Sequence, residues 1–296
     1  MFIVKYKNLF FAISAVLVAA ALGAMVVKGF NVGIDFKGGS MIEVSYTDAR
    51  PDIAALEESI KDKFPGSHMQ LAGEKDLIVR TKDLSDKEHT DIIEELSLSG
   101  ANHLTEKQFS SVGPTIGKEL RSRAWAAMIA VLLGIVLFIA FAFRKVSLPV
   151  SSWKYGLITL VSLVHDVIIP AGIFAYLGKE VNSLFVVALL SILGISVHDK
   201  IVVFDRIREN LKLHTAKEFS DTVGKSLEQT FARSINTSLT ILIVLGALWY
   251  LGPDSTRDFS MLLFAGVAIG TYSSIFFASP LVVLAEKLQI KNRSKK

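Results

Sequence analysis

Charged and titratable side chains lie inside stretches of this sequence that are otherwise apolar. His165 and Asp166 fall near the middle of one stretch, and His198, Asp199 and Lys200 fall toward one end of the next. An ionisable group inside a membrane helix costs roughly 2.5–3.5 kcal/mol on insertion scales. A carboxyl group in a low-dielectric setting favours its protonated form and can bind and release a proton. These residues therefore indicate a path for protons.

Arg233 is a basic group that could act with Asp199. It precedes a further apolar stretch, which would enter the membrane from the side near which Asp199 lies, and a rise of about 1.5 Å per residue brings the two within reach. A guanidinium that moves toward and away from the carboxyl group would couple protonation to helix movement. A static ion pair between two neighbouring helices explains the same residues, and both alternatives stay open at this point.

The other ionisable groups in these stretches divide between function and structure. Asp166 has no obvious basic partner in the sequence, which favours a functional role or a partner on another chain. Lys200 is expected to extend to the cytoplasmic interface, as long basic side chains near helix ends do. His165 and His198 could relay protons, although hydrogen bonds between helices are an equal alternative.

Six apolar stretches would position these groups, and each has roughly the 17–25 residues that a helix needs to cross the hydrocarbon core. The chain is 51% apolar, which agrees with an integral membrane protein. The predicted spans are Leu9–Val27, Ala124–Phe143, Tyr155–Leu177, Leu184–Phe204, Ile235–Leu251 and Phe259–Ala285. The first stretch could instead be a cleaved signal peptide, but its length and the charge pattern favour a retained helix.

Positive charge alternates between the short segments that join the spans. The two terminal tails and the loops after the second and fourth spans together hold 16 Lys and Arg, whereas the other short loops hold only Lys179 and Arg257. Short cytoplasmic loops carry the excess of Lys and Arg in membrane proteins. We therefore expect both termini to be cytoplasmic, with a loop of amphipathic helices near the membrane surface at residues 205–233 and a basic tail at 286–296.

One large soluble segment, residues 28–123, separates the first helix (residues 1–27 with its tail) from the other five (124–285). Hydrophobic alternation and turn residues predict the order strand, helix, strand, strand, helix, strand, which is the ferredoxin-like split motif. The expected strands are Gly39–Thr47, His68–Ala72, Asp76–Thr81 and Asn102–Val112, and the expected helices are Pro51–Phe64 and Asp86–Leu98. The predicted fold class is an α-helical membrane protein with six transmembrane helices and a non-cytoplasmic α+β (ferredoxin-like) domain between helices 1 and 2.

A row of small residues marks the sixth span. Gly266, Gly270, Ser274 and Ala278 recur every four residues, a spacing that allows two helix backbones to approach closely. We expect this face to pack tightly, either within the chain or against a partner. Asn236, near the start of the fifth span, is expected to hydrogen-bond across helices.

Composition excludes several classes of function. The chain has no cysteine, which excludes disulfides, iron–sulfur clusters and thiolate zinc sites, and its six histidines have no metal-site spacing. Gly224-Lys225-Ser226 lacks the earlier glycine of a phosphate-binding loop, because Phe219 stands at that position. No activated nucleophile or hydrolytic pair is seen. We expect no enzyme activity, metal, cofactor or nucleic-acid partner, and the net charge of +4 suits a lipid bilayer with anionic headgroups.

Six motifs in order resemble the SecF family, the smaller partners of SecD in the bacterial protein-export accessory complex, and the resemblance covers nearly the whole chain. The first motif, G-x-D-F-x-G-G, follows the first span. It is carried here by Gly33, Asp35, Phe36, Gly38 and Gly39. The others are Val112–Pro114, Leu163–Val167, Asp199 with Ile201–Asn210 (which includes Asp205, Arg206 and Arg208), Arg233–Ser238 and Gly270–Phe276.

This resemblance implies a half-transporter related to the resistance-nodulation-division superfamily, with SecD supplying six further helices. The pair would use the proton gradient to promote export of unfolded polypeptides through the SecYEG translocon in the bacterial inner membrane, with YajC as a further candidate partner. The α+β domain would then be periplasmic. Asp199 and Arg233 occupy positions that the family uses in proton coupling. The chain departs from the family at His198 and Lys200, where Asn and often Thr are usual.

Two other functions fit parts of the sequence. One is a proton-driven exporter of small molecules or lipids from the same superfamily, but such exporters usually carry twelve spans in one chain. The other is a passive scaffold of the translocon, which would tolerate neutral substitutions at Asp199, Arg233 and Asp166.

Overall fold

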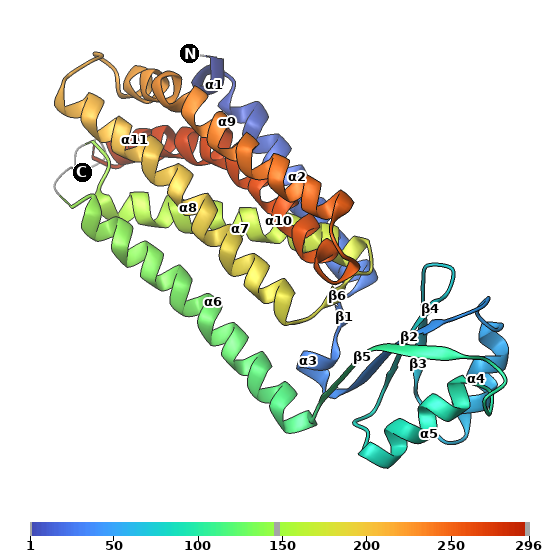
Figure 1. Cartoon of the computed structure of the whole chain (residues 1–296). Helices are drawn as coiled ribbons and strands as arrows, with labels where there is room; N and C mark the ends of the chain where they lie inside the picture. The colour runs from blue at the N-terminus through green and yellow to red at the C-terminus, as the bar shows by residue number, and fades with distance from the viewer. Residues whose placement is uncertain (1, 145–148, 294–296) are drawn as a thin grey trace. The chain divides into compact units, whose positions relative to one another are not determined.

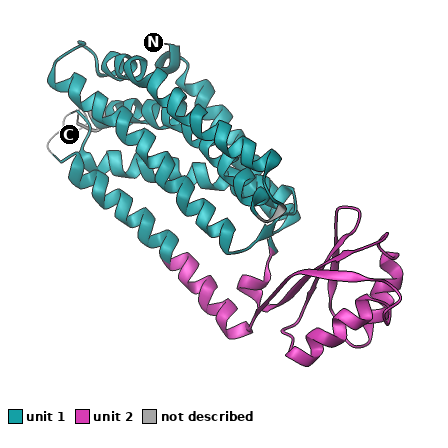
Figure 2. Ribbon diagram, in the orientation of Figure 1, with its two compact units in different colours: residues 1–31, 127–296 teal, residues 32–126 magenta. Residues whose placement is uncertain are grey.

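The computed structural model describes residues 2–144 and 149–293 of the chain. They form two compact units, a helical unit of residues 1–31 and 127–296 and an α+β unit of residues 32–126 (Figure 2). Within the described residues, six helical segments are long and apolar enough to cross a membrane. The fold class predicted from the sequence is confirmed.

The helical unit contains the long helices seen in Figure 1. Its elements are α1 (Phe2–Lys5), α2 (Lys7–Lys28), the part of α6 (Pro114–Ala142) from Ala127 on, α7 (Ser152–Tyr176), β6 (Glu180–Val181), α8 (Ser183–Lys212), α9 (Phe219–Leu251), α10 (Asp254–Ser273), the π-helix η1 (Ser274–Ala278) and α11 (Ser279–Arg293). The predicted sixth span is therefore a composite of α10, η1 and the start of α11. A π-helical turn inside an α-helix commonly occurs at a functional site.

Residues 205–233 differ from the predicted loop of surface helices. Helix α8 continues to Lys212 and α9 already begins at Phe219, so that only residues 213–218 join them. The two extensions pack on each other because Ile207, Val223 and Leu227 are buried in one hydrophobic cluster. The apolar periodicity of this segment therefore serves contacts between the two helices.

Two hydrophobic clusters fill the helical unit, and a polar layer separates them. One cluster includes Ile158 of α7 and Val203 of α8, and the other includes Ala171 of α7 and Ile192 of α8. On each helix, the buried polar residues fall between these apolar positions. They are Ser162, His165 and Asp166 on α7 and Ser196, Asp199 and Lys200 on α8. Buried polar groups need hydrogen-bond partners, so this layer is the candidate functional site of the helical unit.

Helix α2 packs directly on α7 at a position where neither helix has a bulky side chain. A Cβ atom built on Gly172 would lie 2.4 Å from the Ala21 Cβ and 2.5 Å from the Ala21 Cα. Such contact requires a glycine, because a small residue lets two membrane helices approach backbone to backbone.

The α+β unit has a four-stranded antiparallel sheet with the order β3-β4-β2-β5. Along the chain, one helix follows β2 and a second helix follows β4. The order of elements is therefore that of the predicted ferredoxin-like motif. The elements are β1 (Asn31–Val32), α3 (Ile34–Lys37), β2 (Gly39–Tyr46), α4 (Ile53–Lys61), β3 (His68–Ala72), β4 (Asp76–Thr81), α5 (Asp86–Leu96) and β5 (Leu104–Val112).

The core of this unit follows from the alternation of its central strand. Ile42 and Val44 of β2 are buried on the face that α4 and α5 cover with Leu56 and Ile92. Helix α5 begins with a capping box, in which the Ser85 and Glu88 side chains each bond the other's backbone amide. The hydrogen bonds from the Ser85 backbone and side chain lower the pKa of Glu88 to about 2, so the box holds its carboxylate form.

Gly38 and Gly66 provide a matched test of backbone packing in this unit. Both have a left-handed φ, of 80° and 82°. A Cβ on Gly38 would lie 2.8 Å from the Pro114 Cα, whereas one on Gly66 meets nothing within 4 Å. We expect Gly66→Ala to cost about 1–2 kcal/mol for its left-handed conformation alone, and Gly38→Ala to cost clearly more. Hydrogen exchange of the β2 amides in the full chain measures both, and equal losses of protection would contradict this packing.

Candidate functional site

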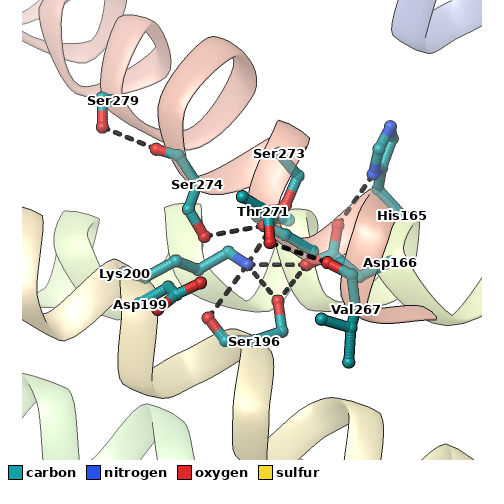
Figure 3. Close-up of polar contacts among 12 residues, drawn as sticks. His165, Asp166, Ser196, Asp199, Lys200, Val267, Thr271, Ser273, Ser274 and Ser279 are labelled. Atoms are coloured by element: carbon teal, nitrogen blue, oxygen red, sulfur yellow. Dashed lines mark hydrogen bonds and ion pairs between the residues drawn. The ribbon is translucent and has the colours of Figure 1, made fainter. Parts of the chain in front are cut away.

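A cluster of buried polar groups lies where α7, α8 and α10 meet (Figure 3). Its centre is an ion pair between Lys200 and Asp166, whose side chains have no exposed area. The Lys200 Nζ lies 2.6 Å from the Asp166 Oδ2, 2.5 Å from the Ser196 Oγ and 3.2 Å from the Ser273 Oγ. The Ser196 hydroxyl also donates to the Asp166 carboxylate. Three helices are therefore joined through one ammonium group.

Local helix geometry explains how these groups converge. Ser196 and Lys200 are four residues apart on α8 and so lie on one face of that helix. Ser273 is the last residue of α10, directly before the π-helical turn. Gly270, one turn earlier, lets α10 approach α8 closely, because a Cβ there would lie 3.0 Å from the Ser196 Oγ.

His165 completes the cluster on the other side of the carboxylate. Its Nδ1 lies 2.9 Å from the Asp166 Oδ1. The imidazole ring stacks on Phe277 of η1 with 4.9 Å between ring centroids. Its Nε2 is buried and has no hydrogen-bond partner among the described residues. Both oxygens of the Asp166 carboxylate thus have partners.

Two expectations from the sequence are wrong at this cluster. Asp166 has a basic partner, and Lys200 points into the helical unit instead of extending to an interface. The reason is rotation about the helix axis. Consecutive residues of an α-helix point about 100° apart, so that Lys200 faces α7 and α10 while its neighbour Asp199 faces α9.

Asp199 belongs to a separate hydrogen-bonded group at the contact of α8, α9 and α10. Its side chain is buried, with 6% of the residue exposed. The Ser238 Oγ donates to the Asp199 Oδ2 at 3.3 Å, and the Thr271 Oγ1 lies 2.7 Å from the Ser238 Oγ. Within the described residues, Asp199 has no ion-pair partner, and the hydrogen-bond partner of its carboxyl group is the Ser238 hydroxyl.

A pocket of about 260 Å³ lies against this carboxyl group, between α8 and α9. This is far more space than a single water molecule needs. The pocket is lined by Gly194, Ile195, His198, Asp199, Thr237, Ser238 and Ile241. Asp199 is therefore a buried carboxyl group beside an open space, and the exposed His198 lines the same space.

The expected contact between Arg233 and Asp199 is not formed in this structure. Arg233 is exposed, and the part of the chain that the structure describes gives it no ion pair. Arg233 nevertheless lies four residues before Thr237, which lines the pocket, so the two share one face of α9. Arg233 is thus one helical turn away from the pocket. The sequence placed Arg233 at the entry to the fifth span, but α9 begins earlier, at Phe219, and the distance of Arg233 from Asp199 depends on packing.

The row of small residues on the sixth span faces α8 of the same chain. A Cβ on Gly266 would lie 2.2 Å from the Ile192 Cδ1. Ser274 donates to the Gly270 carbonyl oxygen at 2.8 Å, and Ala278 is fully buried. Asn236, in contrast, is exposed, and its side chain makes no hydrogen bond to a described residue.

The family-motif residues outside the polar layer lie at the starts of elements, in the interior or in ion pairs. Gly33 precedes α3, Phe36 of α3 is buried, and Gly39 opens β2. At the far end of α8, Arg208 pairs with Asp205 at 2.6 Å, and Arg206 pairs with Glu209 at 2.5 Å.

Sequence reasoning assigned no site role to Ser196, Ser273 or Thr271, because single hydroxyl residues are common in membrane helices, whereas Ser238 makes the hydrogen bond across helices that was expected of the polar residues at the start of the fifth span. The four-residue spacing of Ser196 and Lys200 was the signal that could have placed both on one polar face. No group of three or more His, Asp or Glu side chains among the described residues could hold a metal ion.

The chain combines a helical unit that has buried ionisable side chains with a ferredoxin-like unit. These features define a multi-pass membrane protein with buried charged groups in its membrane helices. Residues 92–288 match the family described as "Protein export membrane protein SecD/SecF, C-terminal", and residues 23–49 match the "SecD/SecF GG Motif". The chain is 35% identical to the protein translocase subunit SecF of Anaerolinea thermophila, over 97% of this chain and 94% of that protein. The chain therefore belongs to the SecD/SecF family of protein export membrane proteins.

Relatives with a fused architecture also match. The chain is 36% identical to protein translocase subunit SecDF of Thermus thermophilus, over 92% of this chain and 37% of that protein. A crystal structure of SecDF, titled a translocon-associated membrane protein, from the same organism superposes with a TM-score of 0.83 at 34% identity. The superposition covers 96% of this chain and 38% of the longer one.

Proposed function

We propose that this chain is the SecF-type subunit of an accessory complex that uses the proton gradient to promote export of unfolded polypeptides through the SecYEG translocon. Family membership supports the export role. The observation that carries the proton role is Asp199, a buried carboxyl group that accepts a hydrogen bond from the Ser238 hydroxyl and lies beside a pocket of about 260 Å³.

The chemistry follows from what faces Asp199. Without a counter-charge in contact, burial favours the protonated carboxyl group, and a donor that enters the pocket can supply the proton. His198 lines the same pocket and can pass a proton between water and Asp199. When Arg233 moves one turn toward the pocket, its positive charge favours the carboxylate and releases the proton. Movement of α8 against α9 thereby becomes coupled to proton transfer.

The complex would pair this chain with SecD, which is consistent with the fused form of the SecDF relatives. In this arrangement the chain lies in the bacterial plasma membrane with both termini in the cytoplasm and the α+β unit in the periplasm. The alternation of Lys and Arg between the short loops supports this orientation. YajC remains a further candidate partner.

Maturation of a secreted precursor tests the proposal in cells depleted of their own SecF. We expect the wild-type chain to restore maturation and Asp199→Asn to fail, with unchanged membrane levels and unchanged co-purification with SecD. Asp221→Asn is the matched control, because it makes the same chemical change at an exposed position of α9. Normal maturation with Asp199→Asn would favour the passive scaffold, and failure of the wild-type chain would contradict the export role.

A further inference from the structure

Lys200 is a fully buried charge that the mechanism proposed for Asp199 does not use. We propose that its ammonium group is a built-in cation, which fills an oxygen-lined cation site made by Asp166, Ser196 and Ser273. The site then carries no transported ion, and ion exchange is left to Asp199. The second half of this inference rests on the proposed function, whereas the first half does not.

Oxygen atoms coordinate the ammonium group of Lys200. A lysine side chain has three N–H donors. Three oxygens lie within 3.2 Å of the Lys200 Nζ, on Asp166, Ser196 and Ser273, and the Ser196 carbonyl oxygen lies at 3.4 Å. Every donor therefore has an acceptor, and oxygen ligands from three helices surround the nitrogen as they would surround a free hard cation.

The contacts of the Asp166 carboxyl group favour its ionised form. The Asp166 Oδ2 accepts from Lys200 and Ser196, and the Oδ1 contacts the His165 Nδ1. Protonation of the Oδ2 would place an O–H donor against the ammonium donor of Lys200. The neighbouring positive charge favours the carboxylate further. Asp166 is thus arranged to remain an anion, in contrast to Asp199.

Two faces of α8 differ in how they pack. Lys200 and Asp199 are adjacent, but they face different helices and contact different hydroxyl groups. The Lys200 face packs tightly on α10, where Gly270 leaves no room for a side chain beside Ser196. The Asp199 face borders the pocket. Helix α8 therefore presents a fixed charged contact on one side and an open titratable group on the other.

A double-mutant cycle tests the inference. Lys200→Met and Asp166→Asn each leave one buried charge without its counter-charge, so we expect each to lower the amount of folded protein and its thermal stability in detergent. The doubles Asp166→Asn/Lys200→Met and Asp166→Asn/Lys200→Gln restore neutrality. We expect at least one of them to recover both the protein level and export to within about twofold of wild type. Lys225→Met, at an exposed position of α9, is the control for loss of a lysine.

Three results would overturn the inference. Single variants as stable as wild type would show that Lys200 is not a needed counter-cation. Failure of both doubles to accumulate would show that the pair supplies something other than neutrality. A double that accumulates but is as deficient in export as Asp199→Asn would place Asp166 and Lys200 in ion exchange. If the wild-type chain itself fails to support export, the proposed function fails, while the protein levels still test the built-in cation.

Discussion

Asp199→Glu is expected to keep precursor maturation within a few-fold of wild type, whereas Asp199→Asn is expected to slow it by about tenfold or more. Both substitutions retain polar atoms that Ser238 can contact, but only glutamate retains a group that titrates. The pocket beside Asp199 has room for the additional methylene group. The comparison therefore separates the loss of a proton acceptor from a change in shape, and the rate of maturation at matched protein levels measures it.

A glutamate variant as inactive as the asparagine variant would contradict this account of Asp199. In that case the pocket geometry, and not the carboxyl group, would control export. Equal activity of both variants with the wild type would remove Asp199 from the coupling step altogether.

Gly172→Ala is expected to separate α2 from α7 and to destabilise the helical unit by about 1–3 kcal/mol or more. The added methyl group would collide with the Cα and Cβ atoms of Ala21. It would also lie 2.9 Å from the Ala21 carbonyl oxygen. Because backbone atoms cannot rotate out of the way, the helices themselves must shift. The midpoint of thermal aggregation in detergent measures the effect.

Gly134→Ala is the matched control for this packing. It makes the same change within α6, where a Cβ would meet nothing within 4 Å. Alanine also favours a helix over glycine by up to about 1 kcal/mol. We therefore expect this variant to be as stable as wild type or slightly more stable, and a similar loss in both variants would show that the α2–α7 contact is unimportant.

The architecture could be predicted because it depends on signals that are local in the sequence. Span lengths follow from runs of apolar residues, and the strand His68–Ala72 and the start of α5 follow from hydrophobic patterning and turn residues. The outcome confirms the fold class, including the ferredoxin-like unit. The extension of α8 to Lys212 was missed because polar residues on a helix pair are easily taken for a surface loop.

The partners of the buried charges could not be predicted in the same way. The contacts between charged side chains depend on the rotation of each helix about its own axis. They also depend on how far each residue lies along its helix relative to residues on the neighbouring helices. A difference of about 100° separates Lys200 from Asp199, and this rotation decides that Lys200 pairs with Asp166. For the same reason, Arg233 lies one turn away from the pocket instead of against Asp199. Serine and threonine hydroxyl groups carry no strong sequence signal, although they join both sites.

The most direct test of the account is the dependence of export on an imposed proton gradient. Precursor translocation would be measured in membrane vesicles that contain this chain, SecD and SecYEG, with the gradient intact or collapsed by an ionophore. For the wild-type chain we expect the gradient to stimulate translocation and the ionophore to abolish the stimulation. For Asp199→Asn we expect the same slow rate in both conditions. Stimulation by the gradient that persists in Asp199→Asn would contradict the proposal that Asp199 couples proton movement to export.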